Sequence, residues 1–329
     1  MTPGLDSLVA DHPVGSLEAA SFVAALGPAS LEVNGQMFAS ALPRLTRPED
    51  RLRDMDAMGI DLQVISPSPT QYHYWAPADL AEVLVDRQND AVESLCSAQA
   101  DRFLGMGTVA LQQPELAAVQ LEQLIQKRNF KGVQISSLVN GVDIADRVFD
   151  PFWAKAEALG AVVFIHPWGS TLGSRLAEHY LLNVVGQPFE TTVALSKLIL
   201  GGSLDRHPAL KIIAAHGGGY LPLYADRMDH AHAIRPDAGC CLCRPSDYLR
   251  RIWFDSIVHG PAHLERLIEV VGAGRVVLGS DYPFDMGHYD PGRLLASLGP
   301  EVQEAILGGN AQALFGLDAS HDGPIRPPP

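Results

Sequence analysis

Three short apolar runs in this sequence each lead into a residue that can bind a metal ion. His166 and His216 directly follow two of these runs, and Asp281 comes two residues after a third. Imidazole and carboxylate groups are ordinary ligands of Zn²⁺ and similar ions. A single histidine after an apolar run is more often structural. Three such residues in the same relative position indicate a shared metal site.

Seven apolar runs of this kind alternate with longer segments of helical periodicity. The runs lie at 60–65, 103–109, 132–135, 161–165, 211–215, 252–255 and 275–279. The helical segments lie at 49–58, before the first run, and between the runs at 77–98, 114–127, 149–159, 191–200, 221–233 and 261–271. This alternation predicts an α/β fold, a (β/α)8 TIM barrel. In such a barrel the active site lies at the carboxyl ends of the strands, which would bring His166, His216 and Asp281 together.

A closed barrel of this type needs eight strands, and the sequence shows seven. The missing strand is the first, because residues 1–47 contain helix-like and loop-like sequence but no clear apolar strand. We therefore expect a single barrel domain over residues 1–317, with an irregular N-terminal region at 1–47. Residues 318–329 are polar and rich in proline, which indicates a tail outside the barrel.

The composition limits the classes of partner. Hydrophobic residues make up 47% of the chain and charged residues 19%, which is typical of a folded protein with a sizeable core. The formal net charge of −14 disfavours nucleic acid and anionic membranes, so a small-molecule partner is expected. The sequence contains no membrane span or secretory signal, and its four cysteines do not form a disulfide framework. We therefore expect a cytoplasmic location.

Four segments around these residues resemble a known enzyme family. They are Phe-Ile-His-Pro-Trp-Gly at 164–169, Glu-Thr-Thr at 190–192, Ala-His-Gly-Gly-Gly at 215–219 and Gly-Ser-Asp-Tyr-Pro-Phe at 279–284. They are similar to segments of the 2-amino-3-carboxymuconate-6-semialdehyde decarboxylase family, a branch of the amidohydrolase superfamily. The likeness extends from Phe38 to Leu317. It implies a metal-dependent, non-oxidative decarboxylase of a small unsaturated or aromatic carboxylic acid.

The resemblance also implies roles for individual residues. His166 and Asp281 would hold Zn²⁺ or another divalent metal, and His216 would act with Asp281 in catalysis as the acid/base. Arg227 matches an arginine that reaches the substrate carboxylate in a neighbouring subunit's site, which implies a homodimer. The other candidate substrate-binding residues are the aromatic residues Tyr180, Phe284, Trp168 and Trp75. For Trp75, simple packing of a loop is an open alternative.

The sequence departs from the family pattern in two places. The family's first strand carries a His-X-His pair that supplies two metal ligands, whereas His12 is the only histidine in the first 72 residues here. We expect that the true start lies upstream of Met1, and the alternative is a natural variant that lacks two ligands. The second departure is Ala39, which stands where the family has a carboxylate-binding arginine. Arg44 or Arg47 is close enough in sequence to replace that arginine. The substrate itself therefore stays open.

Two alternatives to a decarboxylase follow from the same residues. A hydrolase or hydratase of this superfamily, acting on a lactone or a muconate-like acid, would use the same metal-binding residues. A metal-free barrel that binds a ligand is the alternative of a different class. Release of CO₂ distinguishes the decarboxylase from the hydrolase, and metal content distinguishes both from the binding protein.

Overall fold

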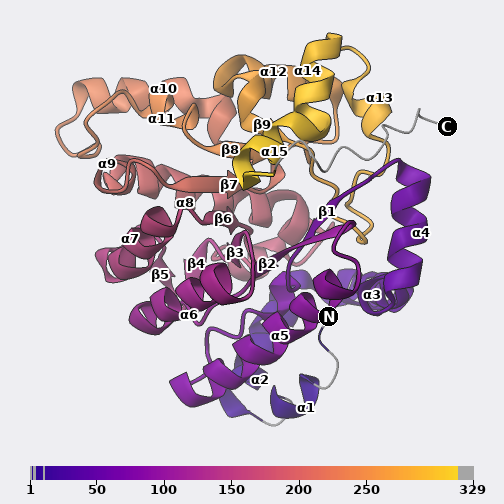
Figure 1. Ribbon diagram of the computed structural model, residues 1–329. Coiled ribbons are helices and arrows are strands. Elements are labelled where there is room, and N and C mark those ends of the chain that lie inside the picture. The colour runs from indigo at the N-terminus through magenta and orange to yellow at the C-terminus, as the bar shows by residue number, and fades with distance from the viewer. Residues whose placement is uncertain (1, 3–4, 10–11, 318–329) are drawn as a thin grey trace.

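A curled parallel sheet of seven strands forms the centre of the molecule (Figure 1). The computed structural model describes residues 2, 5–9 and 12–317, so the tail predicted at 318–329 lies outside the described residues. The strands, in sheet order, are β1 (Gln63–Ile65), β2 (Phe103–Gly107), β3 (Gly132–Ile135), β6 (Val162–Ile165), β7 (Lys211–Ala214), β8 (Trp253–Asp255) and β9 (Val276–Val277). Each strand lies within one of the seven runs identified in the sequence, which confirms the predicted α/β class. A separate hairpin, β4 (Leu138–Val139) and β5 (Val142–Asp143), follows β3.

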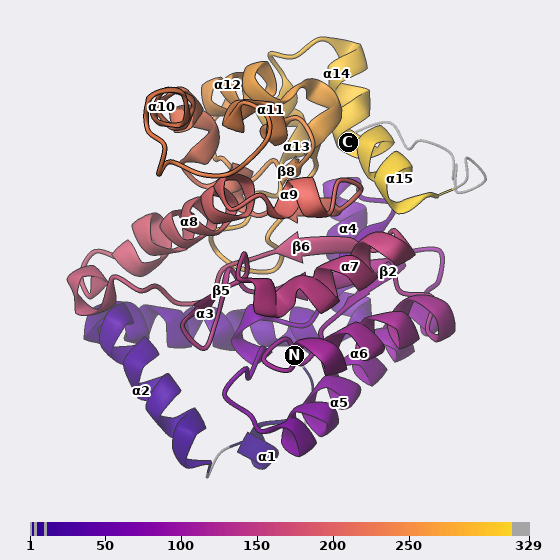
Figure 2. The ribbon, with the colours of Figure 1, turned by 90° about the vertical axis from the view of Figure 1, so that its left-hand side faces the viewer.

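Helices cover the outside of the sheet, the first of them before β1 and the others in the connections between successive strands (Figures 1 and 2). They are α4 (Pro48–Met58), α5 (Ala78–Ala98), α6 (Pro114–Lys127), α7 (Asp150–Leu159), α8 (Gln187–Leu200), α9 (Ser203–Arg206), α10 (Leu221–Ile234), α11 (Pro245–Leu249) and α12 (Pro261–Val271). In α5, the buried residues Ala81, Leu84, Val85 and Val92 recur at helical spacing, so one stripe of the helix faces the core. The helices predicted between the runs are therefore confirmed.

The described part of the chain ends in the helices α13 (Pro291–Leu295), α14 (Pro300–Glu304) and α15 (Asn310–Phe315), and α15 packs against the sheet at the amino ends of the strands. One apolar cluster joins strand residues to the last of these helices: Val64, Met106, Val162, Ile213, Val277, Leu314 and Phe315. The Nζ of Lys211, the first residue of β7, donates to the carbonyl oxygen of Leu314 at 3.5 Å. Helix α15 therefore lies opposite the carboxyl ends, where the site is expected.

The N-terminal region is helical, which corrects the prediction of an irregular segment at 1–47. It contains α1 (Asp6–Val9), α2 (Pro13–Leu26) and α3 (Pro28–Thr46). Pro13 and Pro28 stand in the first turn of α2 and α3, where the missing N–H breaks no helical bond. Gly27, with φ of 78°, turns the chain between the two helices. No single described helix is long and apolar enough to cross a membrane, and α2 and α3 meet that criterion only as a pair bent by 109°.

The outer strands of the sheet, β9 and β1, have no strand between them among the described residues. We call this gap the β9–β1 seam. Helix α4 spans it with side chains: Arg51 Nη1 donates to Gln63 Oε1 on β1 at 2.7 Å. The same guanidinium lies 4.8 Å from the ring centre of Tyr282, in the loop after β9. The seam lies where a barrel's first strand would pair, in agreement with the strand that the sequence lacks.

Candidate active site

His166, His216 and Asp281 come together at the carboxyl ends of the strands, as the sequence predicts. One potential ligand atom from each residue lies within 4.8 Å of the other two. His166 Nε2 is 4.0 Å from Asp281 Oδ1, and the ring centres of His166 and His216 are 4.8 Å apart. The three side chains can therefore reach one ion.

The surroundings of the two histidines fit a divalent metal. His166 Nδ1 lies 2.9 Å from the carbonyl oxygen of Pro167, which leaves Nε2 on the side of Asp281. Burial and, second, the neighbouring His216 lower the pKa of His166 to about 4, so the neutral ring that ligates metals dominates at neutral pH. Burial also lowers the pKa of His216, whose buried Nδ1 has no hydrogen-bond partner among the described residues. An unmatched nitrogen beside a carboxylate and a second imidazole suits a cation.

The backbone at the site is held in an unfavourable conformation. His216 and Asp281 have φ of 55° and 52°, in the left-handed region that residues other than glycine rarely adopt. Asp255, the last residue of β8, supports the loop of His216. Its Oδ1 accepts hydrogen bonds from the backbone N–H of Gly217 at 2.9 Å and of Ile257 at 3.1 Å. Asp255 is buried, and burial raises its pKa to about 6. Sequence analysis missed this residue, because a carboxylate inside a strand gives no signal of its backbone partners.

The loop that carries Asp281 is fastened by side chains. Ser256 Oγ accepts a hydrogen bond from the backbone N–H of Gly279 at 3.1 Å, just before this loop. After Asp281, the hydroxyl of Tyr282 donates to Asp54 Oδ2 on α4 at 2.7 Å. These two contacts involve residues that precede and follow Asp281 in the chain. They fix the backbone on which its carboxylate depends.

Helix α8 shapes the loop that follows His166. Glu190 Oε1 accepts hydrogen bonds from the backbone N–H of Thr171 at 2.6 Å and from its hydroxyl at 2.7 Å. The hydroxyl of Ser170 donates to the same oxygen at 3.1 Å. The Glu-Thr-Thr segment, which the sequence marks only by resemblance, therefore has a structural role beside the site.

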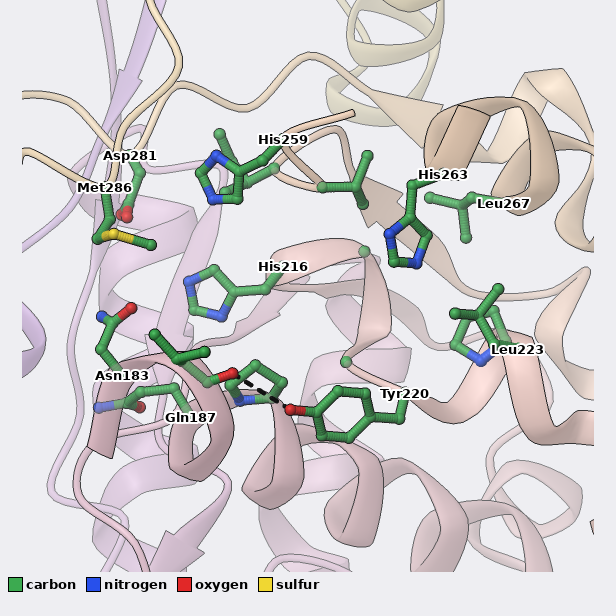
Figure 3. A pocket seen from close by; sticks show the side chains of 17 residues that line it. Asn183, Gln187, His216, Tyr220, Leu223, His259, His263, Leu267, Asp281 and Met286 are labelled. Atoms are coloured by element: carbon green, nitrogen blue, oxygen red, sulfur yellow. Dashed lines mark hydrogen bonds between the residues drawn. The ribbon is translucent and has the colours of Figure 1, made fainter. Parts of the chain in front are cut away.

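A cavity of about 210 Å³ opens beside His216 and Asp281 (Figure 3). One wall is the start of α8 and the turn before it, which carry Gln187 and Asn183. The opposite wall includes His259, in the loop after β8. Sequence analysis missed Asn183 and Gln187, because uncharged polar residues at helical spacing look like an ordinary solvent-exposed face.

Three of the four aromatic candidates lie near the site. Phe284 donates its backbone N–H to the carbonyl oxygen of Asp281 at 3.1 Å. Tyr180 is close enough that its pKa is raised to about 12, by burial first and then by nearby carboxylates that include Asp281. Trp168, two residues after His166, stacks on Phe22 of α2 at 4.4 Å between ring centres. None of the three is among the residues that line the cavity.

The structure places Trp75 in packing contacts, which favours the packing alternative, and its role in substrate binding stays a prediction. Its ring centre lies 4.5 Å from that of His12, just before α2. A side chain at Gly15 would come within 2.8 Å of the Trp75 ring, so α2 fits closely against it. Trp75 does not line the cavity. An aromatic residue after a strand can equally pack against a neighbouring helix, and the sequence could not separate the two cases.

The arginines considered for substrate binding lie outside the cavity of their own chain. Arg227 is exposed on α10. Ala39 is exposed on α3, and neither of the two arginines that were candidates to compensate for it lines the cavity of this chain. Arg44 Nε donates to Asp54 Oδ2 at 2.8 Å, and Arg47 is exposed at the end of α3. Arg44 instead supports the carboxylate that holds the loop of Asp281.

Comparison with known proteins decides the family. A family model described as amidohydrolase matches residues 20–317. The chain belongs to the amidohydrolase family. It is 35% identical over 296 residues to 2-amino-3-carboxymuconate-6-semialdehyde decarboxylase of Dictyostelium discoideum, across 88% of this chain and 82% of that protein. It is 30% identical to gamma-resorcylate decarboxylase of a Polaromonas species, across 82% of this chain and 87% of that protein.

Solved structures of decarboxylases share the fold of this amidohydrolase. One is 5-carboxyvanillate decarboxylase from Novosphingobium aromaticivorans, complexed with manganese and a nitrobenzoic acid, with a TM-score of 0.77 and 28% identity over 84% of this chain and 83% of that one. Another is 2,6-dihydroxybenzoate decarboxylase complexed with 2,6-dihydroxybenzoate, with a TM-score of 0.75 and 26% identity over 82% of this chain and 88% of that one. The predicted class, a metal-dependent decarboxylase and therefore a carbon–carbon lyase, is confirmed. Manganese in a solved relative supports a divalent metal without specifying zinc.

Proposed function

We propose that this enzyme removes CO₂ from a small aromatic or unsaturated carboxylic acid at His166, His216 and Asp281. The observation that carries the proposal is the convergence of their ligand atoms within 4.8 Å beside an open cavity. His166 and Asp281 would hold the metal, either zinc, as the family resemblance implies, or manganese, as in the solved relative. A divalent metal there would act as a Lewis acid toward oxygen atoms of the substrate.

The chain itself supplies the proton that the reaction needs. His216 protonates the carbon that carries the carboxylate. The bond between this carbon and the carboxylate then breaks, its electron pair returns to the ring or double bond, and CO₂ leaves. Burial lowers the pKa of His216, whereas the neighbouring carboxylate of Asp281 raises it and so favours the protonated ring that donates to carbon. Because His216 lines an open cavity, solvent can restore its proton.

We also propose a homodimer in the cytoplasm. Arg227 is exposed on α10 and does not reach the cavity of its own chain, which supports a role in the site of a second copy. Leu223 and Tyr224 on the same helix are 37% and 65% exposed, so this helix offers apolar surface to such a copy. The four cysteines are free, in keeping with a reducing compartment. The net charge of −14 argues against nucleic acid and anionic membranes as partners.

The direct test measures CO₂ release from 2,6-dihydroxybenzoate and related acids by protein stripped with a chelator and reloaded with Zn²⁺ or Mn²⁺. His216→Asn should lower turnover by at least about a hundredfold and keep bound metal, because it removes the proton donor. Asp281→Asn should lose the metal as well. His230→Asn, an exposed histidine on α10, is the matched control. Metal-dependent hydrolysis of a lactone without CO₂ would favour the hydrolase, and a protein without metal or turnover would favour the binding protein.

A further inference from the structure

Three of the four cysteines lie on the loop between α10 and α11, and none of them lines the active-site cavity. They are Cys240, Cys241 and Cys243. In Figure 1 this loop lies at the edge of the molecule, beyond the sheet and its helices. Two residues separate Cys240 from Cys243, which is the spacing of Cys-X-X-Cys pairs that change between dithiol and disulfide. The spacing therefore indicates thiol chemistry away from the metal site.

The outer two cysteines of this loop are open to solvent, whereas the other two cysteines of the chain are protected. Cys240 and Cys243 are exposed. Cys241 is only 5% exposed, and burial is the first of the causes that raise its pKa. Cys96, on α5, is half-buried, and burial raises its pKa to about 11. Because the thiolate is the form that attacks a disulfide, Cys96 and Cys241 are kept unreactive, and Cys240 and Cys243 remain available.

Hydrogen bonds hold the loop in a bend between the two exposed cysteines. The chain bends at Leu242 and Cys243. The backbone N–H groups of both residues donate to the hydroxyl oxygen of Tyr248, each at 3.1 Å. The N–H of Leu242 also donates to Asp205 Oδ2 at 3.0 Å. Two side chains of the fold therefore hold the backbone on the inner side of the bend, and the thiols of Cys240 and Cys243 are left outside it.

The three thiols of the loop form one cluster. Cys240 and Cys243 each lie near enough to Cys241 to contribute to its raised pKa. The Sγ of Cys241 lies 3.8 Å from Nδ1 of His232 on α10, so this sulfur faces the protein. Leu242 is 83% exposed, so the bend projects into solvent. Because only two residues separate Cys240 from Cys243, a bond between their sulfur atoms requires a local adjustment of the loop and no movement of a helix.

A metal site is not the chemistry that this cluster favours. Among the described residues, only His166, His216 and Asp281 bring three possible ligand atoms within 4.8 Å of one another. The thiols of the loop are therefore not arranged around a single ion, even with His232 beside them. A disulfide needs two accessible thiols only, and the loop provides them.

We propose that Cys240 and Cys243 form a reversible disulfide by exchange with small disulfides of the glutathione type. One thiolate attacks the small disulfide, forms a mixed disulfide with it and releases one small thiol. The second thiolate then attacks the sulfur of the first cysteine, forms the Cys240–Cys243 bond and expels the second small thiol. The chain loses two electrons and two protons, and the small disulfide gains both.

The second step should be faster than its competitors. The resolving thiol is fixed two residues from the mixed disulfide, so its effective concentration is far above that of a thiol on another molecule. Closure within one chain should therefore precede both a second glutathione adduct and a cross-link between two copies. This proposal does not depend on the reaction at His216.

The first experiment maps the thiols of the full-length protein. Before oxidation, two thiols should react with Ellman's reagent at least about tenfold faster than the other two. The protein is then treated with oxidised glutathione, and the remaining thiols are labelled with N-ethylmaleimide in denaturant. Mass spectrometry of the peptides should find the label on Cys96 and Cys241 and a bond between Cys240 and Cys243. Excess dithiothreitol should break this bond.

The second experiment removes one partner at a time. Cys240→Ser and Cys243→Ser change exposed side chains, so the fold should be retained. After the same treatment each variant should keep one glutathione on its remaining exposed cysteine, because no second thiol is present to expel it. Cys96→Ser is the matched control, since Cys96 lies outside the loop, and this variant should form the disulfide as the wild type does.

Three results would overturn the proposal. The first is a stable glutathione adduct on both exposed cysteines of the wild type, and the second is a disulfide that includes Cys241. The third is wild-type protein that forms cross-linked copies on a non-reducing gel in place of the internal bond. None of these measurements uses CO₂ release, so a failure of the proposed decarboxylase function would be seen separately.

Discussion

The loops of His216 and Asp281 face the same cavity, but they are held in different ways. On the β7–β8 side, the strands are paired through their backbones, and Asp255 receives backbone N–H groups from the loop of His216. At the β9–β1 seam no described strand closes the sheet, and Tyr282 ties the loop of Asp281 to Asp54 on α4. The loop of His216 therefore follows a strand that is paired on both sides, whereas the loop of Asp281 lies beside an unpaired edge of the sheet.

The two loops should therefore respond differently when a contact that holds them is removed. Buried N–H groups that lose their acceptor destabilise the fold by about 1–3 kcal/mol each, whereas a side-chain hydrogen bond contributes only about 0.5–1.5 kcal/mol net. Damage on the β7–β8 side should reduce both stability and turnover. Damage at the seam should change the position of Asp281 while most of the stability remains.

The largest effect is expected for Asp255→Val. This change leaves the N–H groups of Gly217 and Ile257 without an acceptor, so stability should fall by about 2–6 kcal/mol, offset in part by removal of a buried acid. Turnover should fall as well, because the loop of His216 loses its support. Urea unfolding and CO₂ release are the measurements. Asp255→Asn keeps an acceptor oxygen and should restore most of both quantities, and a loss below about 1 kcal/mol in the valine variant would show that this side is held in another way.

A smaller change in the free energy of unfolding is expected from the titration of His166, which follows the paired strand β6. Burial lowers its pKa from 6.5 to about 4, so between these pH values the unfolded chain binds more protons than the folded chain. Metal-free protein should therefore lose stability as the pH falls from about 6.5 to about 4, by at most about 3 kcal/mol.

The matching measurement compares metal-free wild type with His166→Gln by urea unfolding across this window. The stability difference between them should change by about 2–3 kcal/mol in the stated direction. The pKa of Asp255 is raised to about 6, which makes ionisation of this group destabilising as the pH rises, but both proteins contain it and its effect cancels in the difference. A difference that stays constant with pH would show that His166 is not buried in the neutral form.

Much of this arrangement was predictable from local sequence, because strand runs and amphipathic helices are properties of a few consecutive residues. The convergence of His166, His216 and Asp281 followed from the rule that the carboxyl ends of parallel strands meet. The contact between Tyr282 and Asp54 could not be predicted, because it joins residues 228 positions apart. Distant contacts also stabilise the N-terminal region at 1–47, which the sequence analysis predicted to be irregular.

Helix α3, which contains Phe38, is stabilised by a tertiary contact. The ring of Phe38, on α3, packs against that of Phe284 at 5.6 Å between ring centres. A propensity scale for residues 31–38 contains nothing about this partner. The place of Gln187 could not be predicted from local sequence either. Its buried Oε1, which has no hydrogen-bond partner among the described residues, is recognised only when the whole cavity is assembled.

The smallest change in stability is expected for Tyr282→Phe at the seam. The variant loses the hydroxyl that donates to Asp54, while Arg44 still occupies that carboxylate, so unfolding free energy should drop by only about 1 kcal/mol or less. Metal affinity should nevertheless fall about tenfold or more, because the loop of Asp281 is less firmly positioned. Titration with Zn²⁺ or Mn²⁺ measures this, with Tyr224→Phe on exposed α10 as the control. Unchanged metal affinity would mean that Ser256 alone is sufficient to position Asp281, and the two sides of the site would then be held alike.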